Sequence, residues 1–468
     1  METRPIPHPP RRVPLLGDIL GMDRAAPSQR TLWQHQQLGP IYRRVIVGTK
    51  LTFVTGSELV EEMNDEKRFR KHVGRPLAKL RTIVADGLFT AFHNEPNWSK
   101  AHNILMPGFT REAMRGYHQT MLDSTRELIA RWDERATAEF VDVPAEMSKL
   151  TLEMIGRAGF GYSFDSFGRA DSDQAEDPFV GAMLRALRHA EQTAIPIPFR
   201  GLFAGKAERQ NDADIAYVAG VVDEVIAERR AKGESADTRR PDLLDLMLHS
   251  TDPETGERLD EVNIRNQVLT FLVAGHETSA NALAFALYFL AQNPEVAARA
   301  RAEVESLWPG EEQPEVSFEQ VAKLRYVRRV VDETMRLWPT APGYFREAVA
   351  DTTIGDGYEF KQNDWAFVLV LGLHRDPVWG PDVETFDPDR FLPENVRARP
   401  GHVYKPFGTG LRACIGRQFA LHEMVLALAL LVHRYDLEPE PGYQLKVKEQ
   451  LTLKPDEFRL RVRRRVSP

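Results

Sequence analysis

KPFGTGLRACIGRQFA, residues 405–420, is the stretch that decides the fold. It is a glycine-rich loop that opens a helix, and it carries Cys414, the only cysteine in 468 residues. A cysteine at a helix N-terminus has free backbone N–H groups and the positive end of the helix dipole beside it, and both favour a thiolate. A thiolate in such a loop would be a good metal ligand.

A single cysteine restricts the kind of metal site. Zinc ribbons and protein-ligated iron–sulfur clusters need two or more thiolates, and no HxxxH-type histidine pair lies near Cys414. An iron atom that four porphyrin nitrogens already hold needs only one protein ligand. Two other interpretations stay open at this point. The spacing Gly408-x-Gly410-x-x-Ala413 imitates a dinucleotide fingerprint, although a Lys-Pro pair replaces the strand that such a motif follows. A lone cysteine is also often a small buried hydrophobe.

Composition excludes several classes of protein. The chain has 61 Lys and Arg against 68 Asp and Glu, a net charge of −7, so it lacks the basic excess expected for nucleic-acid binding. The longest apolar run, Met424–Val432, is well short of the roughly 20 residues that span a bilayer. The proline-rich N-terminus has no apolar segment typical of a signal peptide. We therefore expect a cytoplasmic protein without a membrane anchor.

The chain reads as mostly helix with small sheets at both ends. No repeat of 20 to 50 residues is present, and we expect one compact unit. Breaker-rich surface loops are expected at 168–177, 231–241, 251–256 and 309–314. Strands are expected as a hairpin at Tyr42–Val47 and Leu51–Val54, at Trp365–Leu371, and as a pair around Leu445–Leu453 and Phe458–Val462 that turns at Pro455-Asp456.

One helix should cross the core. Residues Glu261–Asn293 contain no proline, and about 33 helical residues would measure on the order of 50 Å. Its middle places Gly275 and three polar side chains, His276, Glu277 and Thr278, within an apolar run. Glycine weakens a helix by about 1 kcal/mol against alanine, and buried polar groups cost more. A ligand against this turn would account for them.

Four motifs together resemble the cytochrome P450 family. FGTGLRACIG resembles the cysteine-ligand loop of the family, and AGHET at 274–278 resembles the oxygen-activating kink of its long central helix. ETMR at 333–336 resembles the E-x-x-R helix, and FDPDRF at 386–391 resembles the loop whose arginine joins that pair. All four occur in the family's order.

Further stretches resemble the haem domain of the bacterial self-sufficient fatty-acid hydroxylases over nearly the whole chain. These are DGLFTAF (86–92), NWSKAHNILMPGF (97–109), LTLEMIGRAGFGYSFDSF (150–167), EVNIRNQVLTFLVAGHET (261–278), RLWPTAP (336–342) and LTLKP (451–455). The resemblance implies a mainly α cytochrome P450 fold with small β-sheets and a long central helix over haem b. It implies that residues 1–468 form a single haem-thiolate monooxygenase domain.

The resemblance also implies a reaction and its partners. One oxygen atom of O2 would enter a C–H bond of a small hydrophobic substrate. The similar hydroxylases carry a fused flavin reductase, whereas this sequence stops at Pro468, so no reductase domain is expected. Electrons would then come from an external ferredoxin or flavodoxin and an NAD(P)H reductase. Four residues flanking the thiolate side would form a basic docking face for such a partner: Lys100, Lys405, Arg412 and Arg417.

Residue roles follow from the matching positions. Cys414 would be the iron ligand, and Thr278, Glu277 and Ala274 would be catalytic. The residues implied to contact haem, with donors for its propionates, are Lys71, Trp98, His102, Phe407 and Arg412. Glu333, Arg336 and Arg390 would brace the ligand loop. The implied pocket is mostly apolar and comprises Phe89, Leu77, Leu80, Ala274, Ala341, Gly343 and Leu451.

The mouth of the pocket departs from the family. The arginine and tyrosine that bind a substrate carboxylate align with Thr49 and Phe53. Arg44 or Lys50 could supply the missing positive charge, and both could equally be solvated side chains. Three functions therefore stay open: subterminal hydroxylation of medium- to long-chain fatty acids, tailoring hydroxylation or epoxidation of a terpenoid or other secondary metabolite, and a haem-based sensor without turnover. The Glu277–Thr278 pair argues against the sensor.

Overall fold

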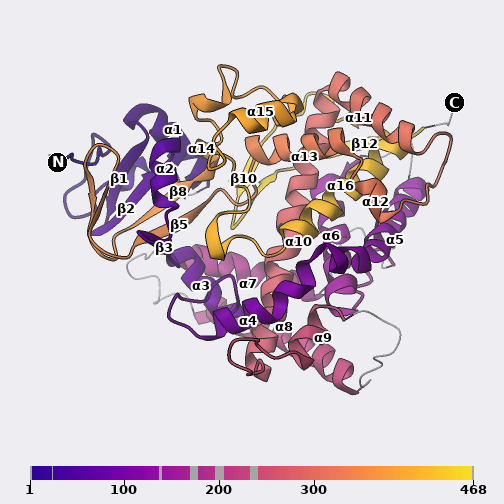
Figure 1. The fold of residues 1–468 in the computed structure, drawn as a ribbon, viewed down its shortest axis with the longest axis horizontal. Helices are drawn as coiled ribbons and strands as arrows, with labels where there is room; N and C mark the ends of the chain where they lie inside the picture. Colours follow the sequence, from indigo (N-terminus) through magenta and orange to yellow (C-terminus); the bar gives the residue numbers. More distant parts are fainter. Residues whose placement is uncertain are drawn as a thin grey trace. The chain divides into compact units, whose positions relative to one another are not determined.

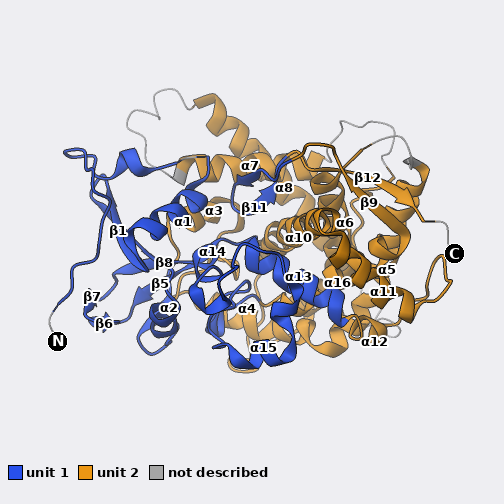
Figure 2. Cartoon of the chain, turned by 90° about the horizontal axis from the view of Figure 1, so that it is seen from above, with its two compact units in different colours: residues 1–72, 325–414, 444–456 blue, residues 73–324, 415–443, 457–468 orange. Residues whose placement is uncertain are grey.

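The computed structural model describes residues 3–23, 25–135, 140–168, 178–194, 205–231 and 241–465 (Figure 1). The chain divides into two compact units (Figure 2). Unit 1 comprises residues 1–72, 325–414 and 444–456, and unit 2 comprises residues 73–324, 415–443 and 457–468. The expectation of one haem domain over 1–468 stays a prediction. No helix among the described residues is both long and apolar enough to span a bilayer.

Unit 1 is built on a five-stranded sheet. Its strand order is β1 (Ile41–Ile46), β2 (Thr49–Val54), β8 (Trp365–Leu369), β5 (Gly343–Ala348) and β3 (Phe69–Lys71). The β1–β2 hairpin is the one that the sequence predicts, and β2 pairs with β8 in parallel. Buried aliphatic and aromatic side chains such as Ile41, Val54 and Phe69 form the core against this sheet.

Short elements complete unit 1. They are η1 (Ile19–Gly21), α1 (Pro27–Leu38), α2 (Ser57–Met63), α13 (Arg325–Leu337), β6 (Thr352–Ile354), β7 (Tyr358–Phe360), α14 (Val370–Leu373), η4 (Pro377–Trp379), η5 (Pro388–Phe391), α15 (Pro393–Ala398), η6 (Gly410–Arg412), β10 (Val447–Glu449) and β11 (Leu453–Pro455). The strand expected at 365–371 ends at Leu369, because the next four residues turn into α14.

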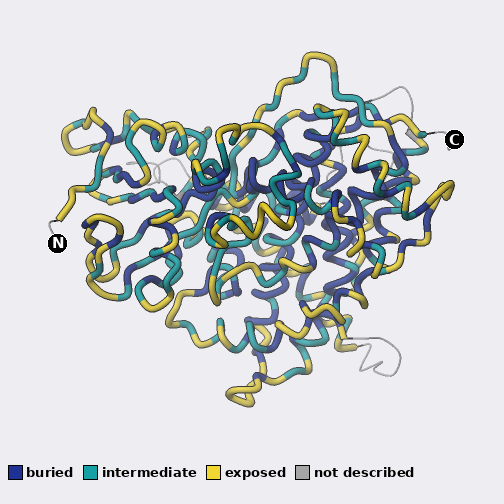
Figure 3. Tube along the Cα trace, turned by 45° about the horizontal axis from the view of Figure 1, so that its top comes forward, coloured by how far each residue is buried: buried dark blue, intermediate teal, exposed yellow. Residues whose placement is uncertain are grey.

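Unit 2 is mostly helical. Its elements are α3 (Arg75–Val84), α4 (Asn97–Leu105), η2 (Met106–Phe109), α5 (Arg111–Arg135), β4 (Val141–Asp142), α6 (Val143–Phe160), α7 (Pro178–Ala194), α8 (Gly205–Ala231), α9 (Leu243–His249), α10 (Glu261–Gln292), α11 (Pro294–Leu307), α12 (Phe318–Val321), α16 (Arg417–Arg434), β9 (Tyr435–Pro439) and β12 (Arg459–Arg464). The long helix α10 matches the sequence prediction to within one residue. Figure 3 shows buried residues concentrated in helices and exposed ones in loops.

Two other sequence expectations have different outcomes. The predicted pairing of the last strands is wrong, because β10 pairs with β11 across a tight turn at 450–452. Strand β12 instead pairs with β9 and β4 in unit 2. The loops at 251–256 and 309–314 are present as predicted, whereas the loops at 168–177 and 231–241, apart from their end residues, lie outside the described residues.

Candidate functional site

The cysteine loop is closed by its own backbone. The N–H of Cys414 donates to the carbonyl of Phe407 at 2.9 Å, and the N–H of Gly408 donates to the carbonyl of Lys405 at 3.1 Å. Gly408 and Gly410 have φ of 71° and 68°, a region that favours glycine. The Cys414 side chain is exposed. Helix α16 begins at Arg417, so the thiol lies three residues before the helix rather than in its first turn.

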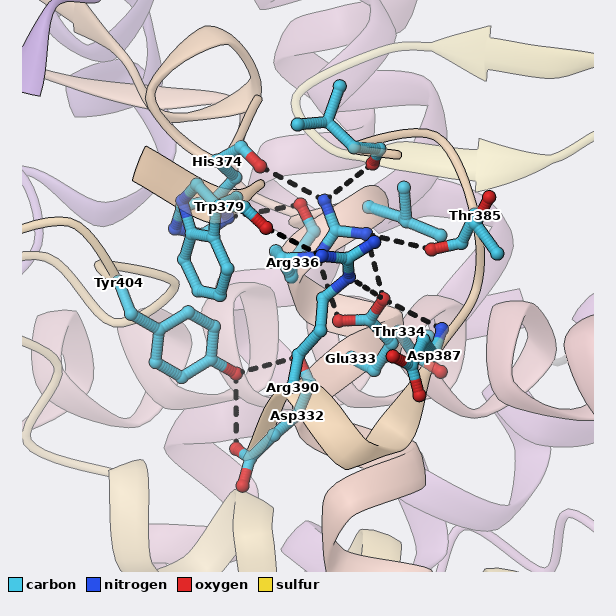
Figure 4. A network of polar contacts seen from close by, with 12 residues as sticks. Asp332, Glu333, Thr334, Arg336, His374, Trp379, Thr385, Asp387, Arg390 and Tyr404 are labelled. Atoms are coloured by element: carbon cyan, nitrogen blue, oxygen red, sulfur yellow. Dashed lines mark hydrogen bonds and ion pairs between the residues drawn. The ribbon is translucent and has the colours of Figure 1, made fainter. Parts of the chain in front are cut away.

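Helix α13 carries a buried ion pair, Glu333–Arg336 (Figure 4). The Arg336 guanidinium donates two hydrogen bonds of 2.7 Å to the Glu333 carboxylate, and both side chains are completely buried. Arg390 Nε lies 3.5 Å from Glu333. The structure thus brings together the three residues that the resemblance links. Burial raises the pKa of Glu333, and the hydrogen bonds and charge of Arg336 oppose that rise.

Backbone groups satisfy the rest of this pair. Arg336 also donates to the carbonyls of His374, Val383 and Thr385 at 3.1, 2.8 and 3.2 Å. The N–H of Asp387 donates to Glu333 at 3.0 Å. Every charged atom of the pair therefore has a partner, which a buried ion pair needs in order to offset its desolvation.

His374 is the residue that sequence reasoning missed. Its Nε2 accepts the Lys405 N–H at 2.9 Å, while its Nδ1 donates to the Arg336 carbonyl at 3.1 Å. Burial and the Arg336 charge lower the pKa of His374 to about 3, so the imidazole is neutral. This ring connects α13 directly to the cysteine loop. A single histidine at the end of a short helix carries no sequence signal of that role.

Two cations lie near each other beside the loop. Burial and the nearby Arg412 charge lower the pKa of Lys71 to about 7. Like charges in a half-buried position are stabilised by an anion, and carboxylates fit both an ammonium and a guanidinium. Unit 1 thus supplies one thiol and two carboxylate-binding cations, which is the donor chemistry that a haem with two propionates requires.

In unit 2, the middle of α10 has one partly exposed stripe. Ala274, Gly275 and Thr278 are half-buried, whereas every other residue from Asn266 to Leu287 is buried. Positions three and four residues apart share a helix face, so Gly275 and Ala274 both lie on the face of Thr278. The helix runs unbroken through this turn, and the Thr278 hydroxyl donates to the Ala274 carbonyl at 2.8 Å. This stripe contains two of the three predicted catalytic residues.

The third predicted catalytic residue, Glu277, is 8% exposed and adjoins the stripe. Gly275 is not required by packing within the unit, since a Cβ there would meet the nearest atom of Ile155 at an ordinary 3.6 Å. Packing among the described residues therefore does not explain this glycine, which leaves the turn without a side chain. A partly exposed face inside a buried helix can accommodate a ligand.

Other predicted site residues are placed as follows. Trp98 and His102 stack on α4, with ring centroids 4.9 Å apart. Leu80 is buried on α3, Leu77 is half-buried on the same helix, and Phe89 is half-buried in the turn that follows it.

In unit 1, a hydrogen bond of 2.9 Å from the Leu453 N–H to the Thr340 carbonyl joins the segments that carry Leu451 and Ala341. Gly343 on β5 cannot be replaced freely, because a Cβ would lie 2.2 Å from the Val368 carbonyl oxygen.

Strand alternation separates the two candidate mouth cations. Residues two apart share a face of β2, so Thr49 and Phe53 lie on one face and Lys50 on the other. Lys50 is exposed and lines, together with Arg43 and Thr49, a shallow hollow of about 250 Å³. The Lys50 side chain thus leaves β2 on the face opposite Phe53, and its role in binding a substrate carboxylate stays a prediction.

Arg44 shares the face of Phe53. Its guanidinium carbon lies 5.0 Å from the Phe53 ring centroid and its Nε donates to Gln34 at 2.6 Å. The residue is 4% exposed, so the expectation of a solvated side chain is wrong, and burial lowers the pKa of Arg44. Among the predicted docking cations, Lys100 is paired with Glu257 at 2.5 Å.

Comparisons with known proteins agree with this arrangement. The cytochrome P450 family model matches residues 7–462. Bifunctional cytochrome P450/NADPH–P450 reductase 2 of Bacillus subtilis is 43% identical over 466 residues, which cover 99% of this chain and 43% of that protein. The self-sufficient cytochrome P450 monooxygenase CYP505E3 of Phanerodontia chrysosporium is 38% identical over 467 residues, 97% of this chain and 42% of that protein.

A solved structure is also similar. The crystal structure of a cytochrome P450, CYP102L1, has a TM-score of 0.92 and 49% identity, and the match covers 99% of this chain and all of that one. This chain spans less than half the length of the curated relatives named above. With the family model, the relatives and the fold in agreement, the chain belongs to the cytochrome P450 family.

Proposed function

We propose that this chain is a haem-thiolate monooxygenase that inserts one oxygen atom of O2 into a C–H bond, with medium- to long-chain fatty acids hydroxylated near the methyl end as its substrates. The observation that carries this proposal is the cysteine loop: one exposed thiol, closed by backbone hydrogen bonds and joined through His374 to the buried Glu333–Arg336 pair. Such a loop holds a single thiolate in one direction.

The family's cofactor is haem b, and the residues present fit it. Cys414 would ligate the iron, with Phe407 beside it in the loop. Lys71, Arg412, Trp98 and His102 carry the N–H donors that two propionates need. When bound, haem supplies the activation of O2, and a thiolate ligand favours cleavage of the O–O bond.

The α10 stripe would handle protons. Thr278 holds its hydroxyl proton on the Ala274 carbonyl in the structure, and rotation about χ1 would turn that hydroxyl toward the open face. Glu277 next to it is an acid within the same turn. An acid and an alcohol at adjacent positions can pass protons from solvent to the open face of α10.

Two observations bear on the substrate. The pocket residues are mostly apolar, as an alkyl chain requires, whereas the positions of the carboxylate-binding pair hold Thr49 and Phe53. Arg44 is the cation on that face, but it is buried against Gln34. A neutral substrate, such as a terpenoid or another secondary metabolite, is therefore the second candidate.

A spin-state titration separates these candidates. Purified protein loaded with haem is titrated with fatty acids of graded length and with their methyl esters. Fatty-acid hydroxylation predicts that the spin-state shift gives a lower dissociation constant for the acids than for their esters. Arg44→Gln should remove this difference in affinity. If esters bind as well as acids, the carboxylate is not recognised and neutral polycyclic compounds become the substrates to test.

Electrons would reach the haem from a redox partner. We propose a ferredoxin or flavodoxin with an NAD(P)H reductase as separate proteins. Reduction of the haem by added ferredoxin or flavodoxin should slow as salt rises, since charged surfaces steer such encounters. Salt-independent reduction would contradict a charged docking face.

A further inference from the structure

An acidic side chain contacts the cysteine loop on a side that the proposed mechanism does not use. Glu66 lies in the turn between α2 and β3, and its Oε1 accepts a hydrogen bond from the Leu411 N–H at 3.0 Å. Leu411 is the middle residue of η6, three residues before Cys414. The family motifs that identified the loop include no partner for this N–H.

Gly410 provides a second and independent contact. A Cβ at this position would lie 2.1 Å from Glu66 Oε1 and 2.6 Å from its Cδ. The carboxylate therefore packs against the α-carbon of the loop, in space that any other residue would fill. Gly410 also has a φ of 68°, a backbone conformation that favours glycine, and a Cβ there would displace the Glu66 carboxylate.

The turn that carries Glu66 is held rigidly. The buried Arg346 guanidinium on β5 donates to the carbonyls of Met63 and Phe69 at 2.9 and 2.6 Å, one at each end of the turn. Tyr344 on the same strand donates to the Asn64 side chain at 2.8 Å. The carboxylate thus reaches the loop from a fixed support rather than from a mobile surface segment.

Charge gives this contact a further effect. Lys71 lies at the end of β3 and Arg412 follows Leu411, so each of the two segments that meet at this contact also carries a cation. Glu66 adds one negative charge within the loop's own hydrogen-bond network. A negative charge near a haem iron favours the oxidised state, because reduction adds another electron to the same region.

We propose that Glu66 is a positioning residue for the cysteine ligand: it fixes loop 405–416 through the Leu411 N–H and Gly410, and its charge lowers the reduction potential of the bound iron. The proposal rests on the proposed function, because it assumes that Cys414 ligates haem. It differs from the Glu333–Arg336 support in acting on the exposed side of the loop through a backbone N–H.

Two substitutions separate geometry from charge. Glu66→Gln keeps an acceptor for the Leu411 N–H but removes the charge, whereas Glu66→Ala removes both. Glu58→Gln, on the exposed first turn of α2, is the matched control. The readouts are the Soret position of the ferrous carbon monoxide complex, which distinguishes thiolate from thiol ligation, and the midpoint potential of the haem.

The expected pattern is specific. Glu66→Ala converts to the thiol-ligated form about tenfold faster in mild denaturant, the effect of losing one charge-assisted hydrogen bond. Glu66→Gln converts at nearly the wild-type rate. Both variants have a more positive midpoint potential, and Glu58→Gln changes neither readout. If Glu66→Ala matches Glu58→Gln in both readouts, the proposal is wrong.

Gly410→Ala supplies a second test. The new Cβ collides with Glu66, so this variant should lose thiolate ligation, and adding Glu66→Ala should restore part of it while the backbone strain remains. Equal loss in the single and double variants would overturn the contact. A wild-type protein whose carbon monoxide complex shows no thiolate ligation would instead overturn the proposed function itself.

Discussion

The support of the cysteine loop in unit 1 and the middle of α10 in unit 2 treat buried polar groups in opposite ways. In unit 1, Glu333 and Arg336 are fully buried and every charged atom has a partner. In α10, the Thr278 hydroxyl donates to the Ala274 carbonyl of its own helix, and neighbouring α16 buries Glu423 without an ion pair among the described residues. The first arrangement pairs every charge, whereas the second keeps a carboxyl without a charged partner among the described residues.

The largest expected effect comes from breaking the unit 1 network. Arg336→Leu leaves Glu333 buried without its cation and should cost about 3–5 kcal/mol of the free energy of unfolding. Denaturant unfolding followed by tryptophan fluorescence measures it. The control is Lys361→Gln, which removes an exposed partner of Asp351 and should leave the midpoint unchanged. Similar losses in the two variants would show that the buried network is not special.

Glu423 tests the second region. Burial raises the pKa of Glu423 to about 8, and the nearby Ser279 opposes part of that rise. The unfolded chain releases this proton near pH 4.5 and the folded chain near pH 8, so stability falls with rising pH over this window, by at most about 1.4 kcal/mol per unit. Glu423→Gln should flatten that dependence and be more stable than wild type at pH 8 by about 2 kcal/mol.

Denaturant unfolding at pH 5.5, 7 and 8 distinguishes this prediction from a packing effect. Glu58→Gln, an exposed carboxyl, should keep the wild-type pH profile. Parallel profiles for wild type and Glu423→Gln would mean that this carboxyl is not protonated in the folded protein.

The motifs could be predicted from the sequence, but the residues that contact them could not. The loop at 405–420 and helix α10 are recognisable because their glycines, cysteine and apolar periodicity are local in the sequence. His374 and Glu66 could not be found in this way, because each acts through one hydrogen bond to a backbone N–H that lies 31 and 345 residues away. Backbone acceptors leave no pattern in the residue types.

Strand geometry explains one further error and one question that the sequence leaves open. Lys50 adjoins Thr49 in sequence but faces the opposite side of β2, so nearness along a strand is not nearness in a site. The pairing of β10 with β11 depended on a turn at 450–452 that contains no glycine or proline. In both cases the deciding information was which residues lie opposite each other.

His374 sharpens the comparison through the opposite response to pH. The unfolded chain takes up a proton at this histidine near pH 6.5 and the folded chain only near pH 3, so the histidine makes stability fall as pH drops through this window. Acid therefore weakens the unit 1 network, whereas alkali weakens the region around Glu423. His374→Phe should lower the free energy of unfolding by about 2 kcal/mol at pH 7, because the Lys405 N–H loses its acceptor. Below pH 6.5, the stability of this variant should depend less on pH than that of wild type.

Unfolding of His374→Phe at pH 5, 6 and 7 measures both parts. A constant difference from wild type at all three values would indicate lost packing alone. A difference that narrows toward pH 5 is the expected result, since wild type then carries the cost of keeping a buried imidazole neutral.

The smallest effect on stability is expected where function depends most on the residue. Thr278→Ala removes one hydroxyl that bonds within its own helix, so the free energy of unfolding should change by less than about 1 kcal/mol and haem should still bind. If Thr278 delivers protons, more of the NAD(P)H consumed should appear as peroxide and less as product. Thr278→Ser, which keeps the hydroxyl, should restore most of the coupling. Unchanged coupling in Thr278→Ala would mean that the α10 stripe serves packing and not proton delivery. The unit 1 network and the middle of α10 would then differ only in how much they contribute to stability.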